Sequence, residues 1–249
     1  MLKTLDNALH LLRYFTRERP QWGVRELARE MNISHPVVYR MLATFERHGF
    51  LRQDEQTQKY ELGITFLEYG AILRDHMSIT QIIYPVMKRL AETTGESVIL
   101  TWLDGMEGIC LEMAESTQRV KYAMSVGSRT LLYAGASNKV IMAYLPPHVQ
   151  EAIIAKGLKP KTDRTILDKD ELLRDLARIR SEGWAYSVGE YTENVFGIAV
   201  PLFAYDKRVV ASLTIAGPDY RMPADAVPAA LRALKEAQQE IQTLLQRIQ

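Results

Sequence analysis

Residues 24–49, VRELAREMNISHPVVYRMLATFERHG, decide the fold of the N-terminal part of the chain. Apolar residues at 24, 27, 28 and 31 fall on one face of a two-turn helix, and those at 38, 41, 42 and 45 on one face of a second. Between them Ser34 can cap the second helix, and Pro36 is tolerated because the first helical turn does not need its missing N–H. Gly49 ends the second helix. The segment therefore predicts a helix-turn-helix.

The flanking residues extend this unit at both ends. Residues 4–16 place their apolar side chains along one stripe of a further helix. Downstream, residues 50–52 and 59–62 have the composition of two short strands joined by a polar turn. We therefore expect a winged helix-turn-helix domain over residues 1–63.

The face of the second helix opposite its apolar stripe carries side chains suited to contact DNA. Such a helix fits the major groove, about 12 Å wide, while the first helix crosses the backbone. The candidates for contact with bases are Ser34, His35, Pro36, Val37, Tyr39, Arg40 and Thr44. The candidates for contact with phosphates are Arg25, Arg29, Arg52 and Lys59. Residues 1–62 hold ten Lys and Arg against eight Asp and Glu, so a helical subdomain for protein contacts remains an alternative.

The composition limits the class of protein. The chain has 249 residues, a net charge of +1, 47% hydrophobic residues and 24% charged residues, which indicates one or two globular domains and excludes wholesale disorder. A single cysteine excludes an internal disulfide framework and a cysteine-cage zinc site. No apolar run reaches the roughly 18 residues that cross a bilayer, and the amphipathic N-terminus does not resemble a signal peptide. We expect a soluble, cytoplasmic protein.

The rest of the chain predicts a linker helix over residues 64–77, with a break at 76–78, and an α+β domain over 78–249. The predicted strands are 97–103, 108–113, 120–125, 184–188, 196–203 and 209–215. The predicted helices include 137–145, 149–155, 169–180 and a closing amphipathic helix at 227–248. Three strands, helices, three more strands and a helix indicate a mostly antiparallel sheet.

Several motifs together resemble the IclR family of transcriptional regulators. They are residues 5–12, SHPVVYRMLAT at 34–44, KYELG at 59–63, VGSR at 126–129, LYA at 132–134 with Lys139, RIRSEGWA at 178–185, Glu190, GIAVP at 197–201 and IAGP at 215–218. The resemblance covers nearly the whole chain in order. It implies a winged helix, a linker helix and an effector-binding domain related to the GAF fold. It also implies that Leu2–Phe15 and Ile64–His76 help to pair the DNA-binding domains.

The sequence departs from the family pattern at four places. Pro36-Val37 stands where the family often has a Ser-Thr pair, so Val37 could instead meet a thymine methyl group. Asn138, Ser187 and Gly197 stand where family members often carry Gly, Asp and Cys. A dimer or a dimer of dimers is expected because one recognition helix contacts too few base pairs for specificity.

The resemblance places the effector over the sheet, beside the start of the helix near residue 137. The backbone N–H groups of Ala136, Ser137 and Asn138 suit a carboxylate there, although Ser137 could be a simple N-cap. The other residues expected at this site are Trp102, Cys110, Met124, Ala134, Ser187, Glu190, Gly197, Thr214 and Ala216. Glu190 could equally be a salt-bridged structural acid. The expected effector is a small organic acid, and the apolar lining favours an aromatic one.

The alternative class is an enzyme that acts on a small acid and carries a helical appendage. It would need a nucleophile with a base, or a metal site. Cys110 has no histidine near it in sequence, and Gly135–Lys139 lacks the second glycine of a nucleophile elbow. The five histidines show no metal-ligand spacing. We therefore expect no enzymatic activity, no cofactor and no metal, with double-stranded DNA and a small-molecule effector as partners and no membrane.

Overall fold

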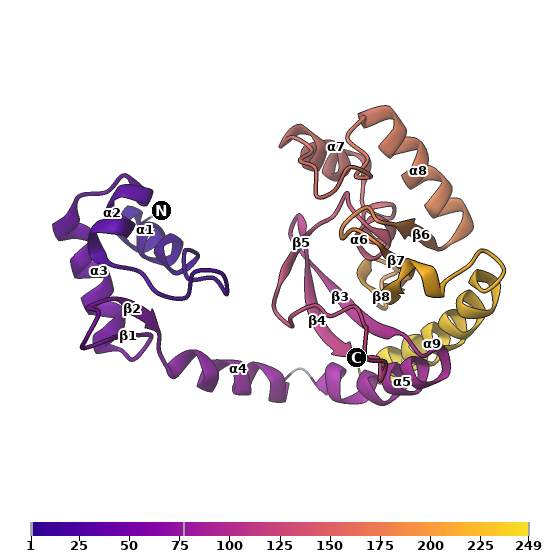
Figure 1. Cartoon of the computed structure of the whole chain (residues 1–249), viewed down its shortest axis with the longest axis horizontal. Coiled ribbons are helices and arrows are strands. Elements are labelled where there is room, and N and C mark those ends of the chain that lie inside the picture. The colour runs from indigo at the N-terminus through magenta and orange to yellow at the C-terminus, as the bar shows by residue number, and fades with distance from the viewer. Residues whose placement is uncertain (1, 77, 249) are drawn as a thin grey trace. The chain divides into compact units, whose positions relative to one another are not determined.

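The computed structural model describes residues 2–76 and 78–248 (Figure 1). The chain divides into two compact units, residues 1–77 and 78–249.

The first unit is a winged helix-turn-helix followed by one further helix. Its elements are α1 (Lys3–Leu12), α2 (Val24–Met31), α3 (His35–Arg47), β1 (Leu51–Gln53), β2 (Tyr60–Leu62) and α4 (Thr65–His76). β1 and β2 form an antiparallel hairpin, the wing. Asn32 adopts a left-handed conformation (φ 51°) that ends α2 and starts the tight turn. The helix-turn-helix predicted from the apolar stripes is confirmed.

The apolar stripes predicted for α1, α2 and α3 all contribute to one hydrophobic core in this unit. Leu11, Leu27, Val38, Leu42 and Leu51 are 0–2% exposed and pack in one cluster. Each fully buried leucine stabilises the fold by about 1.5–3 kcal/mol. Ser34 occupies the N-cap of α3, but its side chain makes no capping hydrogen bond within the described residues, so its predicted capping role is absent here.

The second unit is an α+β domain built on one antiparallel sheet. Its elements are α5 (Ser78–Thr94), β3 (Ser97–Asp104), β4 (Glu107–Ala114), β5 (Arg129–Leu131), α6 (Ala136–Met142), α7 (Pro147–Ala155), α8 (Lys169–Glu182), β6 (Ala185–Val188), β7 (Val195–Phe203), β8 (Val209–Pro218), the 3₁₀ turn η1 (Asp219–Arg221) and α9 (Val227–Ile248). The strand order is β5-β4-β3-β8-β7-β6, and every pairing is antiparallel. The predicted fold class is confirmed. The predicted break after α4 falls at Met77, which lies outside the described residues.

The two faces of this sheet differ in chemistry. One face packs against α5 and α9 (Figure 1). Leu100 of β3, Leu213 of β8 and Leu234 of α9 are fully buried there. The other face packs against α6 and carries small or polar residues such as Gly197 and Thr214. The alternation follows from the two-residue period of a strand.

The predicted strand at 120–125 is wrong. Residues 115–128 form a long loop, here called the strap, and the strand beside β4 is β5 instead. The strap is fixed by side chains from elsewhere: the Ser97 hydroxyl donates to the Tyr122 carbonyl (2.7 Å) and Arg221 donates to the Val120 carbonyl (2.7 Å). The apolar run that suggested a strand contains Tyr122 and Met124, which pack against the sheet from within the loop.

Within the described residues, no helix is both long enough and apolar enough to cross a bilayer. The same part of the chain contains no group of three or more potential metal ligands.

Candidate functional site

The exposed face of α3 carries the side chains predicted to contact DNA. Ser34, His35, Pro36, Tyr39, Arg40 and Thr44 are all exposed, whereas Val37 is half-buried against the core. The Thr44 hydroxyl donates to the Arg40 carbonyl (2.7 Å), so its proton is already engaged. Tyr39 is 52% exposed, so it can present both its ring and its hydroxyl to a partner.

The basic side chains around this face fall into two groups. In the part of the chain that the structure describes, the exposed Arg25 and Arg40 form no ion pair. On the wing, the Arg52 Nε donates to Glu61 (2.9 Å), and the Lys59 ammonium lies 3.6 Å from Glu26. Exposed pairs of this kind contribute only about 0–1 kcal/mol. A phosphate could therefore displace either carboxylate at little cost.

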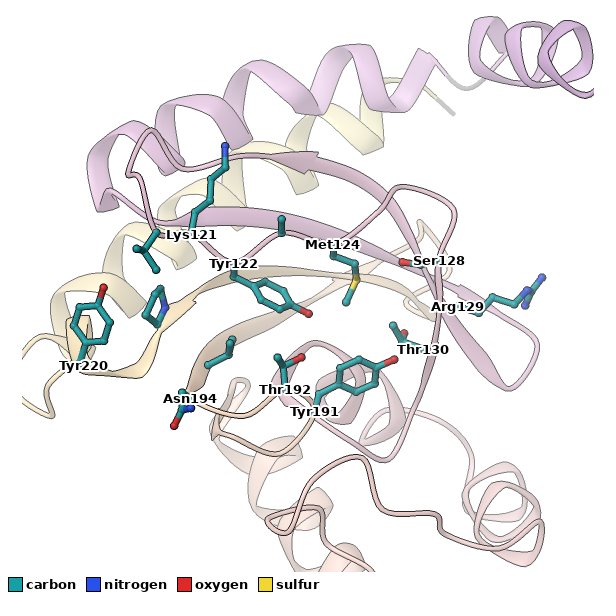
Figure 2. A pocket seen from close by; sticks show the side chains of 14 residues that line it. Lys121, Tyr122, Met124, Ser128, Arg129, Thr130, Tyr191, Thr192, Asn194 and Tyr220 are labelled. Atoms are coloured by element: carbon teal, nitrogen blue, oxygen red, sulfur yellow. The ribbon is translucent and has the colours of Figure 1, made fainter. Parts of the chain in front are cut away.

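A cavity of about 720 Å³ opens beside the sheet of the second unit (Figure 2). Its walls come from the strap, the start of β5, the loop between β6 and β7, and the end of β8 with η1. The lining residues are Val120, Lys121, Tyr122, Ala123, Met124, Ser128, Arg129, Thr130, Tyr191, Thr192, Asn194, Val195, Pro218 and Tyr220. The volume falls in the range of small-molecule sites.

The cavity presents aromatic rings and neutral hydroxyls rather than free charge. Tyr122 and Tyr191 extend into the same space from opposite walls, near Met124 and Thr192 (Figure 2). Burial raises the pKa of both tyrosines, with the Thr192 hydroxyl opposing the effect at Tyr122. Both phenols therefore stay protonated and can donate hydrogen bonds at neutral pH.

The two cations at the edge of the cavity already have acidic partners. Lys121 pairs with Glu115, and Arg129 donates to Asp104 (2.6 Å) and Glu107 (2.8 Å). The hydrogen bond to Asp104, with that to Glu107, raises the pKa of the Arg129 guanidinium above its already high ordinary value. Both cations at the edge of the cavity are therefore engaged in ion pairs in this structure.

Three of the predicted effector residues lie at or under the cavity. Met124 lines it, and Cys110 and Ala216 form the layer beneath, against which Tyr122 and Met124 pack. Burial, with the charge of Glu112, raises the pKa of the Cys110 thiol to about 11. The thiol therefore stays protonated at neutral pH, which does not suit a nucleophile.

A second group of predicted residues adjoins the cavity without lining it. The Ala136 N–H donates to the Ser187 hydroxyl (2.9 Å). A Cβ at Gly197 would lie 3.3 Å from the Ala136 Cβ and 3.8 Å from Thr214 Cγ2. Asn138 connects to the cavity because Thr130, a lining residue, donates to its side-chain oxygen (2.7 Å).

Other predicted residues have different surroundings. The Ala136 N–H donates to Ser187. Of the three N–H groups expected to bind an acid, those of Ser137 and Asn138 have no acceptor among the described residues. The Glu190 carboxylate accepts from Lys139 (2.6 Å) and from the Gly135 N–H (3.3 Å). Ala134 is buried in the cluster shared by α6, α7 and α8.

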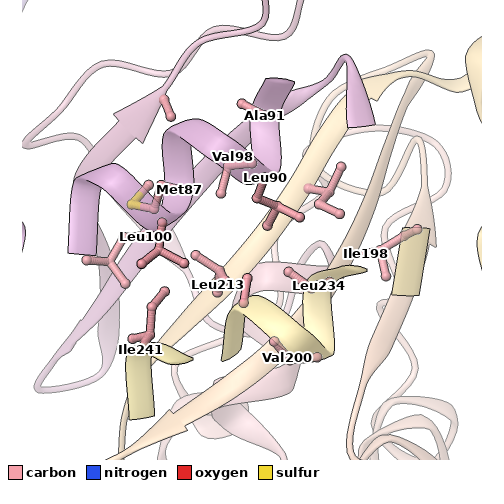
Figure 3. Close-up of a cluster of buried hydrophobic side chains, with 14 of the residues drawn as sticks. Met87, Leu90, Ala91, Val98, Leu100, Ile198, Val200, Leu213, Leu234 and Ile241 are labelled. Atoms are coloured by element: carbon pink, nitrogen blue, oxygen red, sulfur yellow. The ribbon is translucent and has the colours of Figure 1, made fainter. Parts of the chain in front are cut away.

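The structure places Trp102 on the opposite face of the sheet. It packs against the cluster shown in Figure 3, between the sheet and α5 and α9. Alternation along β3 explains this, because Leu100 faces the same way and Ile99 faces the cavity layer. Trp102 therefore does not line the cavity, contrary to the prediction from sequence.

Sequence reasoning missed Tyr122, Tyr191, Thr192 and Asn194. One signal could have found the last three. They follow Glu190 directly, in a turn-rich segment between two predicted strands, and loops beside a rigid sheet often carry binding residues.

A winged helix-turn-helix joined to a second domain with a small-molecule-sized cavity defines a DNA-binding transcriptional regulator. The family model for the bacterial transcriptional regulator IclR C-terminal domain matches residues 72–243, and that for the IclR helix-turn-helix domain matches residues 4–55. The chain belongs to the IclR family of transcriptional regulators.

Individual relatives agree with this assignment. The chain is 32% identical to the HTH-type transcriptional regulator KipR of Bacillus subtilis (strain 168), over 96% of this chain and 95% of that protein. An IclR transcriptional regulator from Silicibacter sp. TM1040 has a similar structure, with a TM-score of 0.89, 29% identity and coverage of 97% and 96%. An IclR homologue from Microbacterium hydrocarbonoxydans, solved in complex with 4-hydroxybenzoate, gives a TM-score of 0.82, 25% identity and coverage of 98% and 99%. The matching domains and relatives are transcriptional regulators, not enzymes, which sets the enzyme alternative aside.

Proposed function

We propose that this regulator acts in the cytoplasm, binds operator DNA as a dimer or a dimer of dimers, and changes its DNA affinity when a small aromatic acid occupies the cavity. In this proposal residues 1–63 bind DNA, 64–77 form the linker helix and 78–249 bind the effector. The exposed face of α3 carries the DNA part of the proposal.

In the proposed complex α3 enters the major groove. Arg40 binds guanine or phosphate, and His35, Pro36, Val37 and Tyr39 contact the adjacent bases. The remaining proposed contacts are those of Ser34 and Thr44 with bases and of Arg25, Arg52 and Lys59 with phosphates.

Exposed apolar side chains support pairing of two chains. Leu5 and Leu9 of α1 are 54% and 55% exposed, and Ile64 and Leu67, at and near the start of α4, are 67% and 69% exposed. Repeated large apolar side chains on one helix are unfavourable in water, so a partner that covers them is expected.

The cavity lining supports an aromatic effector. In this proposal the aromatic ring of the effector lies between Tyr122 and Tyr191, which line the cavity together with Met124. The complex of the Microbacterium hydrocarbonoxydans homologue with 4-hydroxybenzoate supports the same chemical class. The proposed donors to the carboxylate are the N–H groups of Ser137 and Asn138, at the start of α6. They lie outside the cavity lining, which Asn138 contacts at Thr130.

Arg40→Ala tests the DNA-binding part. It should weaken binding to the upstream DNA of the regulated gene by about 1–3 kcal/mol, or roughly 5- to 150-fold, in a mobility-shift titration at physiological salt. The matched control is Arg232→Ala, which removes an exposed arginine from α9 and should change affinity by less than about twofold. Equal affinities for the wild type and Arg40→Ala would refute the role of Arg40.

Ser137→Asp tests the effector part. An aspartate at the start of α6 is tolerated or stabilises by about 0.3–1 kcal/mol, so DNA binding should persist. Its charge should repel an incoming acid, so calorimetric binding of benzoate and 4-hydroxybenzoate should disappear. Acetate is the control ligand and should bind weakly to both proteins. Full binding of the aromatic acids by Ser137→Asp would contradict the proposed carboxylate position.

A further inference from the structure

A lysine side chain is enclosed in the second domain, next to the wall of the cavity. Lys139 of α6 is 1% exposed, and its ammonium donates to Asp175 of α8 (2.7 Å) and to Glu190 of the loop after β6 (2.6 Å). Removing charges from water is costly, and apolar residues of similar volume are often equally stabilising. The neighbours Val140 and Ile141 are themselves fully buried apolar residues. Core stability alone therefore does not explain a charged residue at position 139.

The Lys139 ammonium contacts the loop of residues 189–194, here called the β6–β7 loop, through Glu190. Glu190 Oε2 accepts from the Gly135 N–H (3.3 Å), and the Glu190 carbonyl accepts from the Thr165 hydroxyl (2.8 Å). The next residues, Tyr191, Thr192 and Asn194, line the cavity. Glu190 thus holds the loop through both its side chain and its carbonyl, and the side chain of the next residue, Tyr191, is part of the cavity wall.

We propose that Lys139 is a positioning residue for the effector cavity, which acts through Glu190 to hold the β6–β7 loop and hence the wall formed by Tyr191 and Thr192. This inference rests on the proposed function, in which the cavity holds the effector. Lys139 does not touch the effector. It preorganises the wall, so that binding energy is not used to order the loop.

The two carboxylates that pair with Lys139 lie on different elements and have different further partners. Asp175 lies on α8, also accepts from Arg178 (2.7 Å) and is absent from the cavity lining. Glu190 has Lys139 as its one charged partner among the described residues, and it belongs to the β6–β7 loop. The side chains are similarly buried, at 17% and 12% exposed. They therefore form a matched pair for an experiment.

The experiment compares Glu190→Gln with Asp175→Asn in the full-length protein. Each substitution removes one negative charge from the same ammonium and keeps the shape of the side chain, whereas Lys139→Met would affect both carboxylates at once and leave Glu190 without a cation. Hydrogen exchange of peptides that cover residues 189–195 is the first measurement. We expect exchange about tenfold faster in Glu190→Gln, the effect of losing one charge-assisted hydrogen bond, and within about twofold of the wild type in Asp175→Asn.

Calorimetric titration with benzoate and 4-hydroxybenzoate is the second measurement. The Kd should rise about 5- to 20-fold in Glu190→Gln and stay within about twofold in Asp175→Asn. Equal changes in the two variants, in either measurement, would overturn the proposal, because a merely structural lysine predicts equal effects. A third outcome is possible: exchange in the β6–β7 loop rises only in Glu190→Gln, but the wild type binds neither benzoate nor 4-hydroxybenzoate. This would support the positioning role of Lys139 and refute the proposed effector class.

Discussion

The substitution Gly217→Ala should destabilise the second domain by breaking a buried ion pair. A Cβ at this position of β8 would lie 2.0 Å from Glu96 Oε2 and 2.6 Å from Glu96 Cδ. Glu96 is 3% exposed, and both of its carboxylate oxygens accept from Arg221, one of them at 2.6 Å. The added methyl group therefore forces the carboxylate away from the guanidinium.

The magnitude follows from the burial of the two groups. Breaking a buried pair costs about 3–5 kcal/mol. The Arg221 side chain is 22% exposed, so water recovers part of the loss, and we expect about 2–4 kcal/mol. Arg221 also donates to the Val120 carbonyl (2.7 Å), so the strap should loosen at the same end of the cavity.

Urea denaturation of four proteins measures the effect: the wild type, Gly217→Ala, Glu96→Ala and the double variant. In the Glu96→Ala background the new methyl group no longer meets a carboxylate. The nearest remaining neighbour of the methyl group is then Phe196 Cε1 at 3.1 Å. The loss of unfolding free energy caused by Gly217→Ala in this background should therefore fall below about 1 kcal/mol. Additive destabilisation by the two substitutions would refute the reasoning, because it would show that the methyl group acts on something other than Glu96.

The remaining predictions concern the wing, a buried acid and the cysteine. Arg52→Ala with Lys59→Ala should weaken binding to operator and non-specific DNA alike, and each lost phosphate contact should lower the slope of log K against log salt by about one; a wild-type slope would show that the wing does not touch phosphate. Burial alone would raise the pKa of Asp175, but Lys139 and Arg178 together lower it. The wild type should therefore be more stable than Asp175→Asn by its full margin at pH 7, and this margin should disappear as the pH falls below 3.8, the ordinary pKa of aspartate. A margin that grows toward acid in urea titrations would contradict this. Cys110, with its pKa raised to about 11, should resist iodoacetamide at pH 8 in the native protein and react on unfolding; rapid native labelling would contradict its burial.

The helices and most strands could be predicted because their signals are local. The stripe at positions 24, 27, 28 and 31 gives α2 with the bounds observed, Val24–Met31. The last helix likewise begins at Val227 and ends at Ile248, since its apolar positions recur with the helical period over its whole length.

The cavity could not be predicted in the same way, because remote residues build it. The strap has strand-like alternation, yet its course depends on Ser97 and Arg221, the latter 101 residues from the carbonyl it binds. The partners of Lys139 lie 36 and 51 residues away. Periodicity describes which face of an element is apolar, and it carries no information about which distant side chain will reach a given carbonyl.

The division of the sheet into two faces explains why the sequence can depart from its family without losing the fold. The face packed by α5 and α9 buries Leu100, Leu213 and Leu234 completely (Figure 3), and none of the departures belongs to its cluster. Ser187 and Gly197, two of the departures, lie on the other face, where a third, Asn138, contacts the lining residue Thr130. The fourth, Pro36-Val37, lies on α3. These four departures leave the cluster packed by α5 and α9 unchanged. Under the proposed function, effector and operator specificity can therefore diverge while that packing persists.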